Sequence, residues 1–350
     1  MRVLHILNTG KYSGAENVVC QIIGMFRDQN NIQMAYCSLE GSIREVLGNK
    51  NIEFFPVSKM KASEIRKVIK MYRPDLVHAH DMKASFVAAL VCKNIPLISH
   101  IHNNSFTSRK LSSKSIAFLF AAHKAKTILW VSNSSRDGYY FKDKVASKSL
   151  MLCNAINPID LMEQMDNDNN SYHFDVVYVG RLSYEKDPFR LIDVIEKAVR
   201  LYPSLRVAII GTGDLENEVN SIILRKQLNR NVSALGYKNN PLKIMHDSKV
   251  MIMTSRWEGM PMVALEAIAL GVPIVSTPTD GMVDLVEEGQ TGFLSDDNQI
   301  LAEAIVRIVK DEALHRALSC KQLTLSNAIN NISHYKDVLL GIYNQALKDI

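Results

Sequence analysis

The sequence predicts an α/β protein with two Rossmann-like doubly wound domains that face each other across a cleft. Short apolar runs of strand length alternate with longer helical patterns, which is typical of parallel sheets with crossover helices. The length of 350 residues is too great for one ordinary core and suits two domains of about 150 to 200 residues each. We expect an N-terminal domain over 1–160, a C-terminal domain over 161–330 and a final helix over 331–350.

The first half is expected to form one doubly wound domain. Its first helix has the clearest pattern, because apolar residues recur from Ala15 to Phe26 at the i, i+3, i+4, i+7 spacing of one buried face. The expected strands lie at 3–7, 34–38, 53–57, 75–80, 96–99, 127–131 and 149–152.

The alternation stops between about 154 and 173, where 165–171 is polar and without periodicity, as expected of a linker. A second alternating series then begins, so we place the domain boundary in this stretch. Its expected strands lie at 174–179, 206–210, 232–235, 249–253 and 273–276.

The composition is that of a soluble globular protein, with 47% apolar and 22% charged residues and no stretch approaching the roughly 20 apolar residues that span a bilayer. The first residues form a strand-like run without the features of a signal peptide. The cysteines are odd in number and lack CxxC spacing, so neither a disulfide framework nor a zinc site is expected. We expect a cytoplasmic protein. The cysteines are Cys20, Cys37, Cys92, Cys153 and Cys320.

Positive charge is concentrated in the first half: residues 1–170 contain 22 Lys and Arg against 14 Asp and Glu, whereas 171–350 contain 19 against 22. Several of the cations, among them those of 59–73 and 109–126, accompany apolar residues. Such a surface could attract anionic lipid or a polyanion, at the inner face of the plasma membrane. The alternative is a set of solvated helix faces without a partner. Nucleic acid is not expected as a partner.

The strongest local signal lies at 255–271, where a strand is followed by a loop and a helix. Pro261 suits the first helical position and Gly271 the residue after the helix. The free N–H groups and the positive dipole end of this helix would favour a phosphate or a sugar hydroxyl oxygen, and Gly259 would let the ligand approach the backbone.

Two glutamates accompany this helix start. Glu266 lies among Met, Val, Ala, Leu and Ile, where a carboxylate is costly unless a group such as a ribose diol satisfies it. The alternative for Glu266 is a salt bridge to a neighbouring Arg or Lys. For Glu258 the alternative is an ordinary acid that the helix dipole favours.

Arg181 and Lys186 lie five residues apart in a loop that follows the strand 174–179. Both can reach one diphosphate, the Arg as a fork and the Lys as a point charge. As an isolated pair they would be surface charges.

Two further candidates lie in the first half. Gly14 opens the first helix and could bring its backbone close to a ligand, although a plain loop-to-helix junction is equally compatible. His100 and His102 end a strand on one face, and His102, nearest the edge, is the better candidate to enter the cleft. A structural role is the alternative for His102, and core or supporting roles are expected for His78 and His80.

Two other motifs are dismissed. Residues 211–216 begin like a dinucleotide fingerprint, but Glu216 occupies the third glycine position, so NAD is not expected. The DxD spacing of Asp166 and Asp168 lies in the polar linker instead of at a strand end, so it does not indicate a metal site.

Together these segments resemble the retaining family-4 glycosyltransferases of the GT-B fold over nearly the whole chain. The most specific element is the Glu-x7-Glu spacing of Glu258 and Glu266, and Arg181 and Lys186 match the GR…K loop. Weaker matches follow in the same order as in the family: Gly14 with Glu16, 75–80, 235–237 and 291–294. The sequence departs at Asp284, where relatives often have Glu.

The resemblance implies roles for these residues. Arg181 and Lys186 would hold the diphosphate, Glu266 the ribose and Glu258 the donor sugar, with His102 lining the reaction centre. It also implies no metal and a C-terminal helix that crosses back toward the first domain. The donor site would further include Gly14, Tyr237, Gly259, Met260, Pro261 and Met262.

The expected activity is transfer of a hexose or N-acetylhexosamine, with retention, from a nucleoside-diphosphate sugar, with UDP the expected nucleotide. The acceptor would be a saccharide or a lipid-linked molecule in surface polysaccharide biosynthesis, including capsule and lipopolysaccharide. Two alternatives remain open: an epimerase or hydrolase of nucleotide sugars on the same scaffold, and a non-catalytic protein that binds sugar nucleotides. The loops expected to face the acceptor, at 11–13, 80–85 and 103–114, carry no informative motif.

Overall fold

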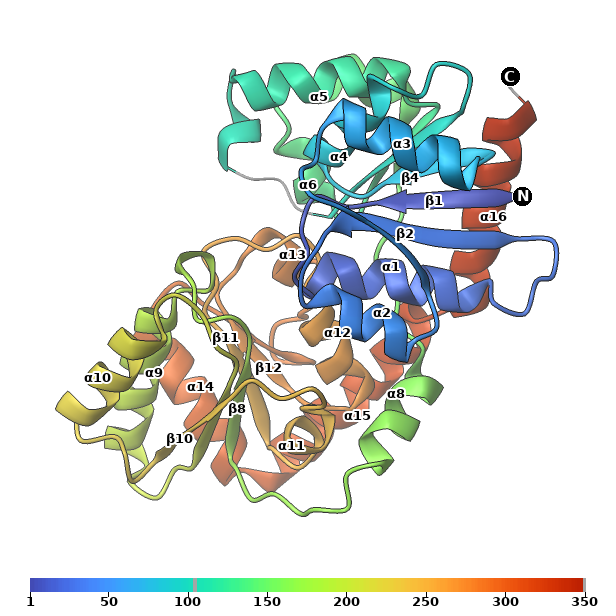
Figure 1. Cartoon of the computed structure of the whole chain (residues 1–350). Coiled ribbons are helices and arrows are strands. Elements are labelled where there is room, and N and C mark those ends of the chain that lie inside the picture. Colours follow the sequence, from blue (N-terminus) through green and yellow to red (C-terminus); the bar gives the residue numbers. More distant parts are fainter. Residues whose placement is uncertain (103–105, 349–350) are drawn as a thin grey trace. The chain divides into compact units, whose positions relative to one another are not determined.

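The computed structural model describes residues 1–102 and 106–348 and divides the chain into two compact units. Unit 1 comprises Met1–Asn154 with Ile332–Ile350, and unit 2 comprises Ala155–Asn331. Each unit is a parallel sheet with helices on both faces, so the prediction of two Rossmann-like doubly wound domains is confirmed (Figure 1).

The sheet of unit 1 has the strand order β3-β2-β1-β4-β5-β6-β7, with every pairing parallel. The order reverses direction between β1 and β4, which makes a switch point where the loops after the two strands diverge. The strands are β1 (Arg2–Ile6), β2 (Gln33–Leu39), β3 (Glu53–Val57), β4 (Leu76–Ala79), β5 (Leu97–Ile101), β6 (Thr127–Trp130) and β7 (Ser149–Met151).

Two apolar clusters form the core of unit 1, one on each face of its sheet. The last helix, α16, belongs to this unit and packs on α1 and β4 (Figure 1). The buried Tyr343 of α16 lies 2.8 Å from His78 Nδ1 through its hydroxyl. The α-helices are α1 (Gly14–Met25), α2 (Ile43–Asn49), α3 (Ala62–Tyr72), α4 (Met82–Ala89), α5 (Ser113–Lys124), α6 (Asn133–Asp137), α7 (Lys142–Val145) and α16 (Ile332–Lys348).

Unit 2 repeats the design with the strand order β10-β9-β8-β11-β12-β13, and its switch point lies between β8 and β11. Its strands are β8 (Val176–Val179), β9 (Val207–Ile210), β10 (Val232–Gly236), β11 (Val250–Met253), β12 (Ile274–Ser276) and β13 (Gly292–Leu294). Its α-helices are α8 (Pro158–Asp166), α9 (Pro188–Leu201), α10 (Glu216–Arg225), α11 (Leu242–His246), α12 (Met262–Ala269), α13 (Asp280–Val283), α14 (Asn298–Lys310) and α15 (Glu312–Ile329).

Two local expectations were wrong, and one strand was not foreseen. The stretch 154–173 is not irregular throughout, because Asn157 caps α8 by accepting from the Ile159 N–H and Pro158 occupies the first turn. Strand β13 was not foreseen, since its apolar run is only Phe293 and Leu294 and it follows turn-like residues at 289–292. Pro261 is the N-cap of α12 and not its first helical residue, so the helix begins one position later than expected, at Met262.

Candidate functional site

The loop after β8 carries Arg181 and Lys186, and the loop after β11 carries Glu258. The two strands are neighbours at the switch point of unit 2, so their carboxyl ends lie side by side. The ammonium of Lys186 forms an ion pair with Glu258, and Ser255 Oγ donates to the same carboxylate at 2.5 Å. Two of the residues predicted for the donor site are therefore in direct contact.

The Arg181 side chain is more exposed than that of Lys186. It is 59% exposed and forms an ion pair with Glu185 at 2.7 Å. An exposed i,i+4 pair of this kind contributes little to folding stability. Its guanidinium is therefore held near the loop by a weak, replaceable partner, which suits a group that has to engage a ligand.

Arg256 joins the two loops and was not foreseen from the sequence. Its guanidinium pairs with Asp187 at 2.9 Å and donates to the Tyr184 carbonyl at 3.1 Å. Its backbone N–H donates to the Glu185 carbonyl at 2.8 Å. These contacts fix the loop of Arg181 and Lys186 against the loop of Glu258. No sequence pattern predicts these contacts of Arg256, because they depend on the adjacency of β8 and β11 in the sheet.

Glu266 lies on α12, and no hydrogen bond or ion pair of its carboxylate is present among the described residues. The alternative considered for Glu266, a salt bridge to a neighbouring Arg or Lys, is therefore absent among the described residues. Burial raises the pKa of Glu266 to about 7. An unpartnered carboxyl with its pKa near neutrality is available to a ligand that donates hydrogen bonds.

The start of α12 is closely packed. A Cβ on Gly281 would lie 1.8 Å from the Gly259 carbonyl oxygen, so only glycine lets α13 approach this loop. Met260, Pro261 and Met262 are buried. Gly271, just beyond the helix, has a φ of +70°, as expected of a residue that ends a helix. Of the other donor-site candidates, Tyr237 follows β10 and is 60% exposed.

The dinucleotide-like motif of unit 2 has a structural explanation. Gly211 has a φ of +134°, and a Cβ there would lie 2.0 Å from the Gly180 carbonyl oxygen. The Gly180 N–H donates to the Ile210 carbonyl at 3.0 Å, and the Leu182 N–H to the Thr212 carbonyl at 2.9 Å. The glycine thus lets the loop after β9 support the loop that carries Arg181.

The DxD-like pair also has a local role. Asp168 accepts from Asn170 N at 3.0 Å, Asn170 Nδ2 at 2.7 Å and the Tyr172 hydroxyl at 3.0 Å, while Asp166 ends α8. The carboxylate of Asp168 is thus used by its own turn.

In unit 1, His102 follows β5 and its Nε2 lies 3.0 Å from His80 Nδ1. His100 and His102 share one face as predicted, with ring centroids 4.2 Å apart. Burial lowers the pKa of His102 to about 3, an effect that the neighbouring Asn154 side chain partly offsets. The ring is therefore neutral at physiological pH.

Two triplets of histidines in the described residues have ring nitrogens within 4.8 Å of one another: His5, His78 and His80, and His80, His100 and His102. His5 and His80, however, are hydrogen-bonded at 2.9 Å. Two nitrogens bound to one tetrahedral zinc at about 2.0–2.1 Å each would lie farther apart than this. The observed spacing is that of rings sharing a proton.

Gly14 is the first residue of α1. The Ser13 hydroxyl donates to the buried Glu16 at 2.6 Å, and burial raises the pKa of Glu16. Asp81, which was not foreseen, accepts from Asn8 N at 2.8 Å and Ala84 N at 2.7 Å, joining the loops after β1 and β4. Unit 1 therefore has its own hydrogen-bonded set of polar groups at its switch point.

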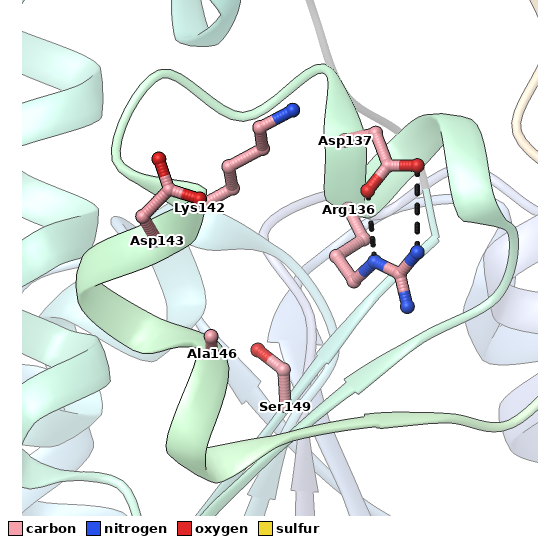
Figure 2. Close-up of a pocket in the computed structure, with 6 residues that line it drawn as sticks. All are labelled: Arg136, Asp137, Lys142, Asp143, Ala146 and Ser149. Atoms are coloured by element: carbon pink, nitrogen blue, oxygen red, sulfur yellow. Dashed lines mark hydrogen bonds and ion pairs between the residues drawn. The ribbon is translucent and has the colours of Figure 1, made fainter.

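A surface pocket of about 300 Å³ lies elsewhere in unit 1 and contains none of the predicted site residues. Figure 2 shows Arg136 and Asp137, paired at 2.9 Å, on one side and Lys142 with Asp143 on the other. Its charged side chains are paired or solvated, and we assign it no function.

Comparison with known proteins agrees with the division of the chain into two units. The model of "Glycosyltransferase Family 4" matches residues 12–157, and that of "Glycosyl transferases group 1" matches 163–322. The UDP-Gal:alpha-D-GlcNAc-diphosphoundecaprenol alpha-1,3-galactosyltransferase of Escherichia coli is 24% identical, covering 98% of this chain and 97% of that protein. The capsular polysaccharide biosynthesis glycosyltransferase CapM of Staphylococcus aureus is 24% identical, covering 84% of each chain.

Solved structures show the same fold. HepE of Anabaena, in complex with UDP-glucose, has a TM-score of 0.85 at 20% identity and covers 99% of this chain and 100% of its own. TarM has a TM-score of 0.80 at 13% identity, covering 98% of each chain.

Two doubly wound domains with these family matches define a glycosyltransferase of the GT-B fold, similar to family 4. The chain is an enzyme, a hexosyltransferase. Within its described residues, no helix has both the length and the apolar character required to cross a bilayer.

Proposed function

We propose that this enzyme transfers a hexose or N-acetylhexosamine from a UDP-sugar to a saccharide or lipid-linked acceptor, with retention, in surface polysaccharide biosynthesis. The observation that carries the proposal is the convergence, at one switch point, of the Lys186–Glu258 pair and the nearby Arg181 loop. HepE is described in complex with UDP-glucose, and the name of the Escherichia coli relative gives UDP-Gal as donor and alpha-D-GlcNAc-diphosphoundecaprenol as acceptor, which supports the donor and acceptor classes.

The chemistry follows from where charge develops. As the bond between the sugar and the diphosphate lengthens, negative charge grows on the departing phosphate, and cations placed beforehand stabilise it. Lys186 has three N–H donors, of which Glu258 engages one, so the others remain available to a phosphate oxygen. Arg181 can exchange its exposed partner Glu185 for a bidentate phosphate contact.

Glu266 is proposed to bind the ribose. Its carboxylate lacks a partner in the described residues, and two ribose hydroxyls would supply the missing hydrogen bonds. Glu258, on the neighbouring loop, is proposed to contact the sugar, and His102 of unit 1 is proposed to take part in the same reaction. Gly14, Tyr237 and the backbone of 259–262 complete the proposed donor set.

We further propose that catalysis is metal-independent, with the two cations acting on the phosphate where some transferases use a metal ion. Incubation with EDTA should then leave turnover unchanged, and restoration of a lost activity by Mg²⁺ or Mn²⁺ would contradict this.

A peripheral contact with an anionic membrane is proposed for unit 1, on the cytoplasmic side of the plasma membrane. Leu111, Ile116 and Phe120, on and before α5, are 61%, 53% and 42% exposed. The exposed Lys110, Lys114 and Lys124 lie on the same segment. Apolar side chains beside cations are the combination that binds an anionic lipid surface.

The decisive experiment is a donor screen with UDP-, GDP- and dTDP-sugars that measures hydrolysis without acceptor and transfer with a lipid-linked saccharide. Hydrolysis of a UDP-sugar and an α-linked product from an α-linked donor are expected. A new sugar nucleotide formed from the donor alone would identify an epimerase, and absence of turnover with every donor would contradict the proposal.

A further inference from the structure

Five histidines from three adjacent strands gather in the interior of unit 1. His5 lies on β1, His78 on β4 and His100 on β5, while His80 and His102 follow the last two strands. His78 and His80 stack with ring centroids 4.0 Å apart. All except His102 are fully buried as whole residues, and His102 Nδ1 is itself excluded from solvent.

Three of these rings form a continuous hydrogen-bonded chain. His5 Nε2 lies 3.4 Å from Met34 Sδ, His5 Nδ1 lies 2.9 Å from His80 Nε2, and His80 Nδ1 lies 3.0 Å from His102 Nε2. Burial lowers the pKa of His5 to about 3 and that of His80 well below its ordinary value. Each ring therefore carries one N–H and one bare nitrogen.

The thioether at one end gives this chain a direction. Sulfur in methionine has no hydrogen and can only accept, so the proton of His5 lies on Nε2 and its Nδ1 accepts from His80 Nε2. His80 Nδ1 must then accept from His102 Nε2. The opposite direction would set the lone pair of His5 Nε2 against the sulfur. Asn154, beside His102, can donate or accept after rotation of its amide and therefore imposes no direction.

We propose that Met34, His5 and His80 are positioning residues that hold His102 in the Nε2–H tautomer, so that its Nδ1 can only accept a hydrogen bond, from the adjoining Asn154 amide or from a substrate sugar hydroxyl that takes the place of that amide. This Nδ1 is buried beside the Asn154 side chain, and no other described residue offers it a hydrogen bond. Because the neutral ring is a very weak base, its role is to orient the hydroxyl, not to remove its proton. The substrate part of the proposal rests on the proposed function, whereas the tautomer does not.

The tautomer is measured directly by two-bond ¹⁵N–¹H correlation spectra of the wild-type protein labelled at histidine nitrogens. His102→Gln, His80→Gln and His5→Asn assign the signals by difference. The expected result is a proton on Nε2 and none on Nδ1 in all three rings. A proton on Nδ1 of His102 overturns the proposal, whatever the enzyme's activity.

Variants then test the source of the constraint. Met34→Leu keeps the side-chain volume and removes the acceptor, so both tautomers should appear at His102 and kcat/KM should fall about two- to tenfold, in proportion to the competent fraction. The matched control is Tyr343→Phe, which removes a 2.8 Å contact of His78 in the same stack but leaves the chain intact. This control should keep the wild-type tautomer and activity.

The outcomes separate the two proposals. A protonated Nε2 in an enzyme that transfers no sugar supports the tautomer assignment and contradicts the proposed function. Transferase activity with a protonated Nδ1 supports the proposed function and contradicts the tautomer assignment. An unchanged His102 tautomer in Met34→Leu overturns the role of the thioether.

Discussion

The ammonium of Lys186 forms an ion pair with the carboxylate of Glu258, although the two residues lie 72 positions apart in the chain. Both side chains are largely buried, at 19% and 10% exposure. Such a pair is costly to break from one side, since removal of one charge leaves the other buried without its partner. The pair therefore links the integrity of the site to its chemistry.

Removal of either cation should impair turnover. Arg181→Ala or Lys186→Ala is expected to lower kcat by roughly 10²-fold or more, the usual scale for loss of one contact to a developing charge. Arg316→Ala is a suitable control for Arg181, because it removes a similarly exposed i,i+4 pair with Glu312. Steady-state kinetics measure the effect. Rates near wild type in both site variants would remove the cations from the mechanism.

The same two variants should differ in stability. Arg181→Ala deletes an exposed pair and should change the free energy of unfolding by less than about 1 kcal/mol. Lys186→Ala leaves Glu258 buried and should cost several times more, about 3 kcal/mol. Urea denaturation followed through Trp257, in a Trp130→Phe background, measures this difference. Equal stabilities would show that Ser255 alone satisfies Glu258.

Donor binding should release protons from Glu266. Its pKa is raised to about 7, so near pH 7 about half of the unliganded molecules carry this proton. Two hydroxyl donors favour the charged form and lower the pKa, so binding of UDP at pH 7 should release about half a proton more in wild type than in Glu266→Gln. Calorimetry in buffers of different ionisation enthalpy measures this difference. Equal release by the two proteins would exclude ribose binding at Glu266.

Acid should destabilise unit 1 through its buried histidines. The pKa of His5 is about 3 when folded and near 6.5 when unfolded, so only the unfolded chain gains this proton as the pH falls below 6.5. The contribution of such a histidine to the free energy of unfolding is fully present above about pH 6.5. It is lost toward pH 3, by about 1.4 kcal/mol per pH unit for each such histidine. His100→Phe removes one of these histidines and should therefore lower the slope by the contribution of one proton, about 1.4 kcal/mol per pH unit.

Trp130, buried in unit 1, reports this unfolding in a Trp257→Phe background. Urea titrations between pH 7.5 and 5 measure the slope. A free energy of unfolding independent of pH in this range would mean that the cluster takes up protons in the folded state.

Membrane binding is expected to depend on the segment around α5. In flotation assays, wild type should float with anionic liposomes and not with neutral ones, and Lys110→Ala/Lys114→Ala/Lys124→Ala should float several-fold less. The control makes the same change of charge at Arg230, Lys238 and Lys321, which are exposed in unit 2. Failure of wild type to float with either liposome would remove the membrane proposal.

Local sequence patterns were sufficient to predict most of the architecture. Apolar runs marked the strands that lead to Arg181 and Glu258, and Gly271 marked the end of α12. They failed where turn-like glycines adjoin the strand, as for β13, or where polar residues are mixed with apolar ones, as for α8. A periodic pattern is recognised only over several residues. Strand β13 has two apolar residues in a row, and α8 mixes apolar with polar residues.

The sequence by itself determined which residues stand at the ends of which strands, because periodicity and helix-start chemistry are properties of neighbouring residues. Only the tertiary structure decided which of them meet: Lys186 with Glu258, Arg256 with Asp187, and His5 with His80. The physical reason is that partners are chosen by the lateral order of strands in each sheet. That order is set by packing and by burial of the crossover helices, and no local spacing encodes it.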